Sequence, residues 1–205
     1  MATNLCDFLL SQDIQASCTD PITPGLEQEG VIMNRSDIDY DSITFDTSRP
    51  NVVSAMTMLT GKKGYKIKVL GNTPFTGTGT SFVAGNYQNT FTHTVQFVVL
   101  DNGPDVCDNV IDMLANGKFV IVLENNYKGL NKASNKGDAA FQIYGFSQGL
   151  VASAIENDKY SEDSNGGWLV TMQETKVSNS GTFLYAGSYA ASKAVFDSLT
   201  STVTA

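Results

Sequence analysis

The chain has 205 residues, which fits one domain or one domain with extended arms and allows a substantial buried core. Its formal net charge of −8 excludes general affinity for nucleic-acid phosphates, because such binding needs clustered Lys and Arg. Residues 1–30 lack the basic start and apolar core of a signal peptide, and no segment approaches the roughly 18 apolar residues that span a bilayer. We therefore expect synthesis in the cytoplasm and no membrane insertion.

The negative charge is concentrated near the N-terminus. Residues 1–60 carry nine acids and two bases, whereas the other 145 residues carry twelve acids and eleven bases. Such a density of like charges is typical of a solvated segment, so residues 1–50 are predicted to form a partly irregular arm, with a piece of the core as the alternative.

Three of these acids, Asp37, Asp39 and Asp41, alternate as in a calcium loop. However, Ser42 and Ser48 occupy the positions where an EF-hand needs glycine and glutamate. We expect the three acids to form an acidic arm or strand edge, or to face a lumen, rather than to bind a metal.

The folded core is predicted to begin at residue 51. Residues 51–59 and 65–70 are rich in β-branched side chains and flank a glycine-containing turn, which predicts a hairpin. A helix over 53–59 is the alternative. Four lysines form either a solvated strand face or a surface that pairs with an acidic neighbouring chain: Lys62, Lys63, Lys66 and Lys68.

A long loop is predicted from residue 71 to residue 90, which is rich in glycine, threonine and asparagine. It carries three isolated aromatic residues, Phe75, Phe82 and Tyr87. Exposed aromatic side chains in such a loop are candidates for burial between subunits. Gly77-Thr78-Gly79 is not followed by the Gly-Lys-Ser/Thr of a phosphate-binding loop, so nucleotide binding is not expected.

The clearest unit runs from Phe91 to Glu124 and predicts a strand, an amphipathic helix and a second strand. Apolar residues and His93 alternate with polar residues up to Val99, as in a strand with one buried face. Phe119–Leu123 is a continuous apolar run, which predicts a strand buried on both faces.

The helix of this unit is predicted over residues 104–116. Pro104 suits the first helical position, and Gly117 is a natural stop. Apolar residues at helical spacing would pack the helix onto a sheet: Val106, Val110, Ile111 and Leu114.

The rest of the chain predicts further strands and a short terminal helix. The strands are expected at 140–144, 150–155 and 168–176, residues 183–185 form a short apolar run, and the helix is expected at 189–199. The predicted fold is mainly β: a sandwich or barrel of antiparallel strands flanked by one α-helix. Its core spans 51–186, and residues 187–205 form a C-terminal arm or short helix.

Residues for catalysis or metal binding are scarce. His93 is the single histidine and falls on the apolar face of its strand, so we interpret it as a hydrogen-bonded core or interface residue. Cys107 lies near a helix start, where a thiol can be activated, but a Cys-His pair is disfavoured. Cys6 and Cys18 are predicted to be buried or idle thiols, and a disulfide between them, if the N-terminus folds back, is the alternative. We expect no enzyme activity, cofactor or metal.

The order of elements resembles the tail tube proteins of tailed bacteriophages and related contractile injection systems. The resemblance is carried by the strand-helix-strand unit 91–124, the hairpin 51–70 with its Gly/Thr-rich extension to residue 90, and the closing strands 139–176. It implies hexameric rings whose sheets join edge to edge around a DNA-conducting channel, stacked by the long loop and terminal arms. The expected partners are other copies, other virion tail proteins and passing DNA that is not specifically bound, and the expected location is the virion tail.

Two other classes remain open. A head-tail joining, neck-ring or tail-completion protein can share this fold. A receptor- or carbohydrate-binding β-sandwich is the second class, with Trp168, Tyr144 and Tyr160 as its stacking platform. Trp168 beside Gly166-Gly167 is also interpreted as a core anchor.

Overall fold

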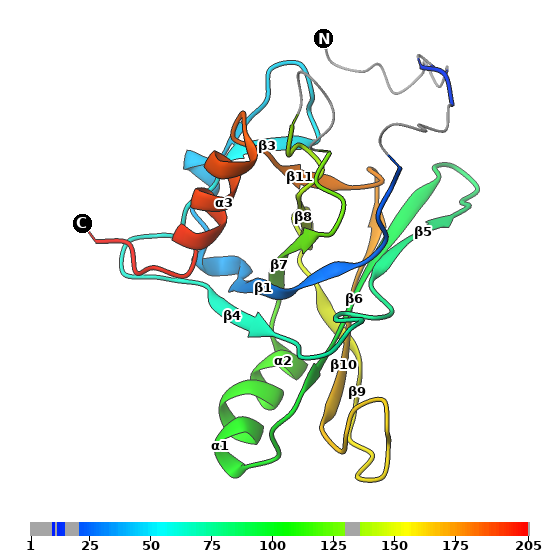
Figure 1. Cartoon of the computed structure of the whole chain (residues 1–205), viewed down its shortest axis with the longest axis vertical. Helices are drawn as coiled ribbons and strands as arrows, with labels where there is room; N and C mark the ends of the chain where they lie inside the picture. Colours follow the sequence, from blue (N-terminus) through cyan, green and yellow to red (C-terminus); the bar gives the residue numbers. More distant parts are fainter. Residues whose placement is uncertain (1–9, 11, 15–20, 130–135, 205) are drawn as a thin grey trace.

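Two β-sheets, a helical segment that links them and a C-terminal helix make up the computed structural model, which describes residues 10, 12–14, 21–129 and 136–204 (Figure 1). The fold is mainly β, as predicted, and neither sheet closes into a barrel within these ranges. The larger sheet has the strand order β2 (Thr44–Phe45), β3 (Val52–Ala55), β11 (Thr182–Leu184), β8 (Phe141–Tyr144), β7 (Phe119–Asn125), β1 (Leu26–Asn34), β4 (Tyr65–Lys68). The smaller sheet has the order β5 (Gly79–Val83), β6 (Thr90–Val99), β10 (Trp168–Val177), β9 (Val151–Glu156).

The elements form three layers. Helix α3 (Tyr189–Ser198) covers one face of the seven-stranded sheet, and the four-stranded sheet packs against its other face (Figure 1). In β7, Val120 and Val122 lie in the core beneath α3, whereas Ile121 and Leu123 lie in the core between the sheets. All four side chains are fully buried, which confirms the predicted strand buried on both faces.

The predicted helix over 104–116 is confirmed. It consists of α1 (Pro104–Val106), a π-helical turn (Cys107–Ile111) and α2 (Asp112–Asn116). The wider π turn changes the helical spacing, so the predicted apolar stripe does not pack as one face. Ile111 and Leu114 are buried, whereas Val110 is 36% exposed and Met113 is 56% exposed.

The predicted hairpin over 51–70 is wrong. β3 pairs with β2 and β11, whereas β4 pairs with β1 at the opposite edge of the same sheet. The alternative helix over 53–59 is also absent from this segment. Val52 and Val53 are both buried and suit an interior strand, whereas the alternating lysines of β4 suit an exposed edge.

The N-terminal region is only partly an arm. β1 lies between β4 and β7, and its Val31 and Met33 side chains are buried beneath α3. Gly30, which reads as a strand breaker in the sequence, is needed there, because a Cβ at this position would lie 2.5 Å from Leu123 Cδ2. The core therefore begins near residue 26 rather than at residue 51.

The predicted long loop over 71–90 is shorter than expected. Residues 79–83 form β5, which pairs antiparallel with residues 90–94 of β6. The segment is therefore a turn at residues 71–78 followed by a β-hairpin with its tip at residues 84–89.

The predicted C-terminal helix is confirmed as α3. Ser188 caps it by accepting a hydrogen bond from the Ala191 backbone N–H at 3.2 Å. Phe196 packs on Phe141, with ring centroids 5.1 Å apart, and this contact fixes the helix on the sheet.

Candidate functional site

The outer face of the four-stranded sheet is uncharged over most of its area. His93, Val95 and Phe97 of β6 point into the core, so the residues between them point outward. The register of β6 with β10 places outward-pointing residues of β10 opposite these outward-pointing residues of β6. The outer face therefore carries Thr92, Thr94, Gln96, Val98, Leu169, Thr171 and Gln173. Gln96 Nε2 donates to Thr171 Oγ1 across the two strands at 2.9 Å.

Few charged groups lie near this outer face. Strands β5, β6 and β9 contain no Lys or Arg, and β10 contains only Lys176, which lies at the bulge after Glu174. Glu156 lies at the end of β9, opposite Leu169. The two helical segments lie on the other side of this sheet in Figure 1, so no helix covers the outer face. The outer face of the four-stranded sheet therefore presents mainly hydroxyl, amide and methyl groups to solvent.

The β5–β6 hairpin projects from one edge of this sheet (Figure 1, green). Its large side chains are in solvent: Phe82 is 60% exposed, Val83 is 44% exposed, and Tyr87 is completely exposed. Phe82 contacts Phe91 of β6 edge to face at a centroid distance of 5.8 Å. Phe82 and Tyr87 are therefore available for contact with another molecule, as their predicted interface role requires.

The expectation that Phe75 is an exposed loop aromatic is wrong. Its side chain is 3% exposed and packs in the core between the sheets. Gly30 of β1 leaves the space that the ring fills, because a Cβ on Gly30 would approach Phe75 Cζ to 3.4 Å. The backbone of Phe75 adopts φ of 58°, an uncommon conformation for a residue with a side chain, which indicates that burial of the ring stabilises this turn.

The three alternating acids lie in short 3-10 turns after β1, away from the uncharged sheet face. Asp37 accepts a hydrogen bond from Asn34 Nδ2 at 2.9 Å and pairs with Lys62 at 3.4 Å. Asp39 precedes the next 3-10 turn (Tyr40–Ser42), and Asp41 lies within that turn. Because they follow β1 of the larger sheet, these acids do not line the outer face of the smaller sheet. In the described part of the chain, no group of three His, Cys, Asp or Glu residues is placed to hold a metal ion.

His93 lies in the core, as predicted, and its partner is Glu174 of β10. The Nδ1 and Oε2 atoms are 3.5 Å apart, and both side chains are almost fully buried. Burial raises the pKa of Glu174, but His93 and the backbone N–H groups of Gln148 and Gly149 stabilise the carboxylate more, so the net pKa lies below its ordinary value. The Nε2 atom of His93 is also buried and has no hydrogen-bond partner in the described ranges. This pair is closed off from solvent and stabilises the sheet from inside.

Of the three cysteines, Cys107 lies in the described part of the chain. Cys107 is a half-buried free thiol in the π-helical turn. The predicted idle thiols Cys6 and Cys18 lie outside the described residues.

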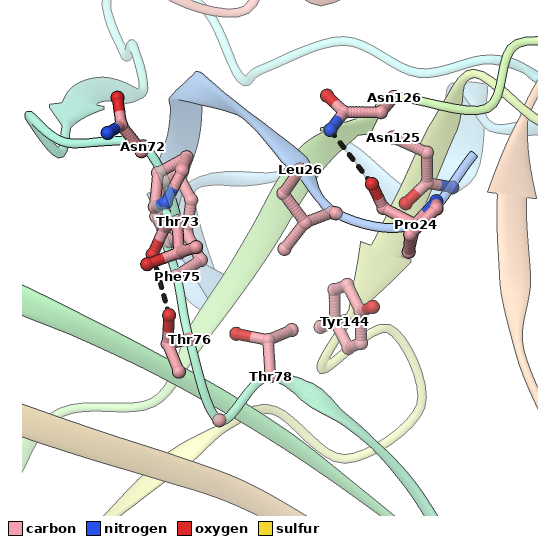
Figure 2. Close-up of a pocket in the computed structure, with 13 residues that line it drawn as sticks. Pro24, Leu26, Asn72, Thr73, Phe75, Thr76, Thr78, Asn125, Asn126 and Tyr144 are labelled. Atoms are coloured by element: carbon pink, nitrogen blue, oxygen red, sulfur yellow. Dashed lines mark hydrogen bonds between the residues drawn. The ribbon is translucent and has the colours of Figure 1, made fainter.

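A cavity of about 500 Å³ opens between the chain before β1, the turn at residues 72–78 and the end of β7 (Figure 2). Its lining residues carry no charge: Pro24, Gly25, Leu26, Asn72, Thr73, Pro74, Phe75, Thr76, Gly77, Thr78, Asn125, Asn126 and Tyr144. Two of their polar groups are already paired, since Asn126 Nδ2 donates to the Pro24 carbonyl and Thr76 Oγ1 donates to the Thr73 carbonyl. Its lining offers threonine and tyrosine hydroxyls, amides and backbone groups, and includes no carboxylate, amine, imidazole or thiol.

The three-residue aromatic platform expected for a carbohydrate-binding module does not form. Tyr144 is 4% exposed and packs against His93 of β6. Trp168 lies opposite Val99, at the C-terminal end of β6. Six residues of strand separate the two positions, or about 20 Å. Tyr160 is 95% exposed in the loop before β10. Trp168 packs partly buried against the core between the sheets.

Among the described residues, the helices are too short and too polar to cross a bilayer. Comparison with known proteins identifies no relative: no family model matches the chain, and neither a curated protein nor a solved structure is significantly similar to it.

Proposed function

We propose that the chain is a self-assembling structural subunit of the tail tube class, in which rings of copies stack around a channel that conducts DNA. One observation carries the proposal. The four-stranded sheet combines a mostly uncharged outer face, two edge strands, β5 and β9, that each pair on one side only within the described residues, and a projecting hairpin with exposed apolar side chains.

Each part of this arrangement suits assembly. An open sheet edge is an aggregation hazard for a monomer and becomes an interface when a neighbouring sheet continues it. Contacts between different patches of identical subunits close into rings or propagate as stacks. The exposed Phe82 and Tyr87 side chains are the kind of residues that subunit interfaces bury.

The uncharged face suits the wall of a channel. Phosphates are held by clustered Lys and Arg, and the central strands β6 and β10 carry a single lysine, Lys176, at the bulge of β10. DNA that passes such a surface is therefore not retained. The virion location, the partnership with other tail proteins and the hexameric ring rest on the resemblance in element order and form part of the same proposal. Of the features that carry this resemblance, the strand-helix-strand unit 91–124 and closing strands within 139–176 are present, whereas the hairpin 51–70 does not form.

The test is self-association measured by sedimentation velocity over a range of protein concentrations. The wild-type chain is expected to form large species, and the double variant Phe82→Ser/Tyr87→Ser is expected to need at least about tenfold more protein to do so. The matched control is Tyr160→Ser, which removes an equally exposed tyrosine from another loop and should assemble as the wild type does. Unchanged assembly of the double variant would refute the role of the hairpin, and rings that never stack would favour a neck or completion ring.

A further inference from the structure

A second surface with unused hydrogen-bonding groups is the uncharged cavity shown in Figure 2. It is lined by residues 24–26, the turn at residues 72–78, Asn125, Asn126 and Tyr144, and we call it the asparagine cavity. Its volume of about 500 Å³ lies within the range of pockets that hold small molecules. Neither Phe82 nor Tyr87 lines it, so binding there does not depend on the proposed self-assembly.

Hydrogen bonds within the chain hold both walls of the asparagine cavity in place. On one side, Thr78 Oγ1 accepts the Gln96 backbone N–H at 3.1 Å. On the other side, the backbone N–H and Nδ2 groups of Asn126 donate to the Gly25 and Pro24 carbonyls, each at 3.0 Å (Figure 2). Because these walls are already ordered, a ligand does not have to order them when it binds.

Side chains of the lining keep hydrogen-bonding groups free for a ligand. Asn125 Nδ2 donates to the Ala139 carbonyl at 2.8 Å and Asn126 Nδ2 is also used, which leaves both Oδ1 atoms without a partner in the described chain. Within the same ranges the Asn72 amide and the Tyr144 hydroxyl have no hydrogen-bond partner, and the hydroxyl is not sealed from solvent. Burial raises the pKa of Tyr144 to about 12, so its hydroxyl stays protonated and can donate at neutral pH.

The remaining lining selects for a neutral ligand. It contains no Lys, Arg, His, Asp or Glu, so a charged ligand would lose hydration without gaining an opposite charge. Pro24, Leu26 and Pro74 add apolar surface beside the amides and hydroxyls. Sugars match this combination, because their hydroxyl groups surround a ring whose C–H groups are apolar. We propose that the asparagine cavity binds a neutral mono- or disaccharide.

A peptide added as a β-strand fits this cavity less well. Strands β1, β7 and β8, which supply Leu26, Asn125 and Tyr144, each pair with a strand on both sides. An added strand needs an unpaired edge, which these three interior strands do not offer. The ligand is therefore held by side-chain amides and hydroxyls, as in other small-molecule sites.

Saturation-transfer difference NMR with the full-length chain tests this inference, since it detects ligands of monomers and of large assemblies alike. The probes are glucose, galactose, mannose, N-acetylglucosamine, cellobiose and lactose, with glucuronic acid and glucosamine as charged relatives. At least one neutral sugar is expected to show saturation transfer, and the charged relatives are expected to give weaker signals. No signal from any neutral sugar, or a stronger signal from a charged relative, would overturn the inference.

Variants locate the bound sugar. Asn72→Ala removes an exposed amide, and Tyr144→Phe removes a hydroxyl but keeps the ring that packs on His93. Each is expected to raise the Kd of the sugar at least about threefold, because each removes one hydrogen-bonding group. The matched controls Asn109→Ala and Tyr160→Phe lie outside the cavity and should leave the Kd unchanged. A Kd that neither cavity variant changes, or that the controls change equally, would place the sugar elsewhere and overturn the inference.

The outcomes also separate this inference from the proposed function. Rings that form from a chain without sugar binding would overturn the inference and leave the proposed assembly intact. Sugar binding at the cavity of a chain that stays monomeric would uphold the inference and count against the proposed assembly.

Discussion

At the residue scale, the structure separates two aromatic residues that look alike in the sequence. Phe75 is buried over Gly30, whereas Phe82 is exposed on β5. Phe75→Ala is expected to lower the free energy of unfolding by about 3–5 kcal/mol, because it leaves a cavity in the core. Phe82→Ala is expected to change it by less than about 1 kcal/mol. Urea unfolding of unassembled protein measures the free energy of unfolding of both variants. Equal losses of stability would contradict the burial of Phe75 and the exposure of Phe82.

Single residues also show where reasoning from sequence stops. The alternation around His93 correctly predicts its buried position, and Glu174 also falls on the inward face of a predicted strand. Their pairing could not be predicted, because it depends on the register between strands that are about 80 residues apart. Phe75 was misplaced because its glycine- and proline-rich surroundings resemble an exposed loop, whereas the space for its ring comes from Gly30 on another strand.

At the scale of elements, the His93–Glu174 pair joins the last regular pair of the β6–β10 ladder, just before its bulge, to the turn at residues 145–149. Glu174 also accepts the Gln148 backbone N–H, and the neutral amide oxygen of glutamine would accept this bond less strongly than the carboxylate does. Glu174→Gln is expected to lower the free energy of unfolding by about 3 kcal/mol near neutral pH.

The same substitution has a defined pH dependence. The folded-state pKa of Glu174 lies below its ordinary value of 4.5, so its contribution is full above that pH and is lost as the pH falls through the lower folded-state pKa. The difference in stability between wild type and Glu174→Gln should therefore shrink on acidification below 4.5. Urea unfolding at about pH 7 and about pH 3.5 measures this change. A difference that grows on acidification would show that the carboxylate is not the stabilising form.

Elements formed by neighbouring residues were predicted well, and distant pairings were not. The helix at 104–116, the buried strand β7, the long strand β10 and the terminal helix α3 follow from local periodicity and end signals. The pairing partners of β3, β4 and β1 do not follow from such local signals, since each of these strands pairs with a strand far along the chain. Local sequence favoured a hairpin at 51–70, but burial of Val52 and Val53 in the sheet interior determined the pairing.

At the scale of the whole molecule, the described chain leaves two kinds of surface incomplete. One is the mostly uncharged outer face of the four-stranded sheet with its apolar β5–β6 hairpin, and the other is an apolar groove of about 650 Å³ between β4, the end of β6 and the helix at 104–116. Under the proposed function, one of these patches contacts a different patch of a neighbouring copy. Interfaces of this kind produce closed rings or open stacks rather than isolated twofold dimers.

Negative-stain electron microscopy of the purified full-length chain tests the central claim of self-assembly most directly. The account predicts rings with a central opening, and stacks of such rings at higher protein concentration. A uniform monomer at every protein and salt concentration would contradict it.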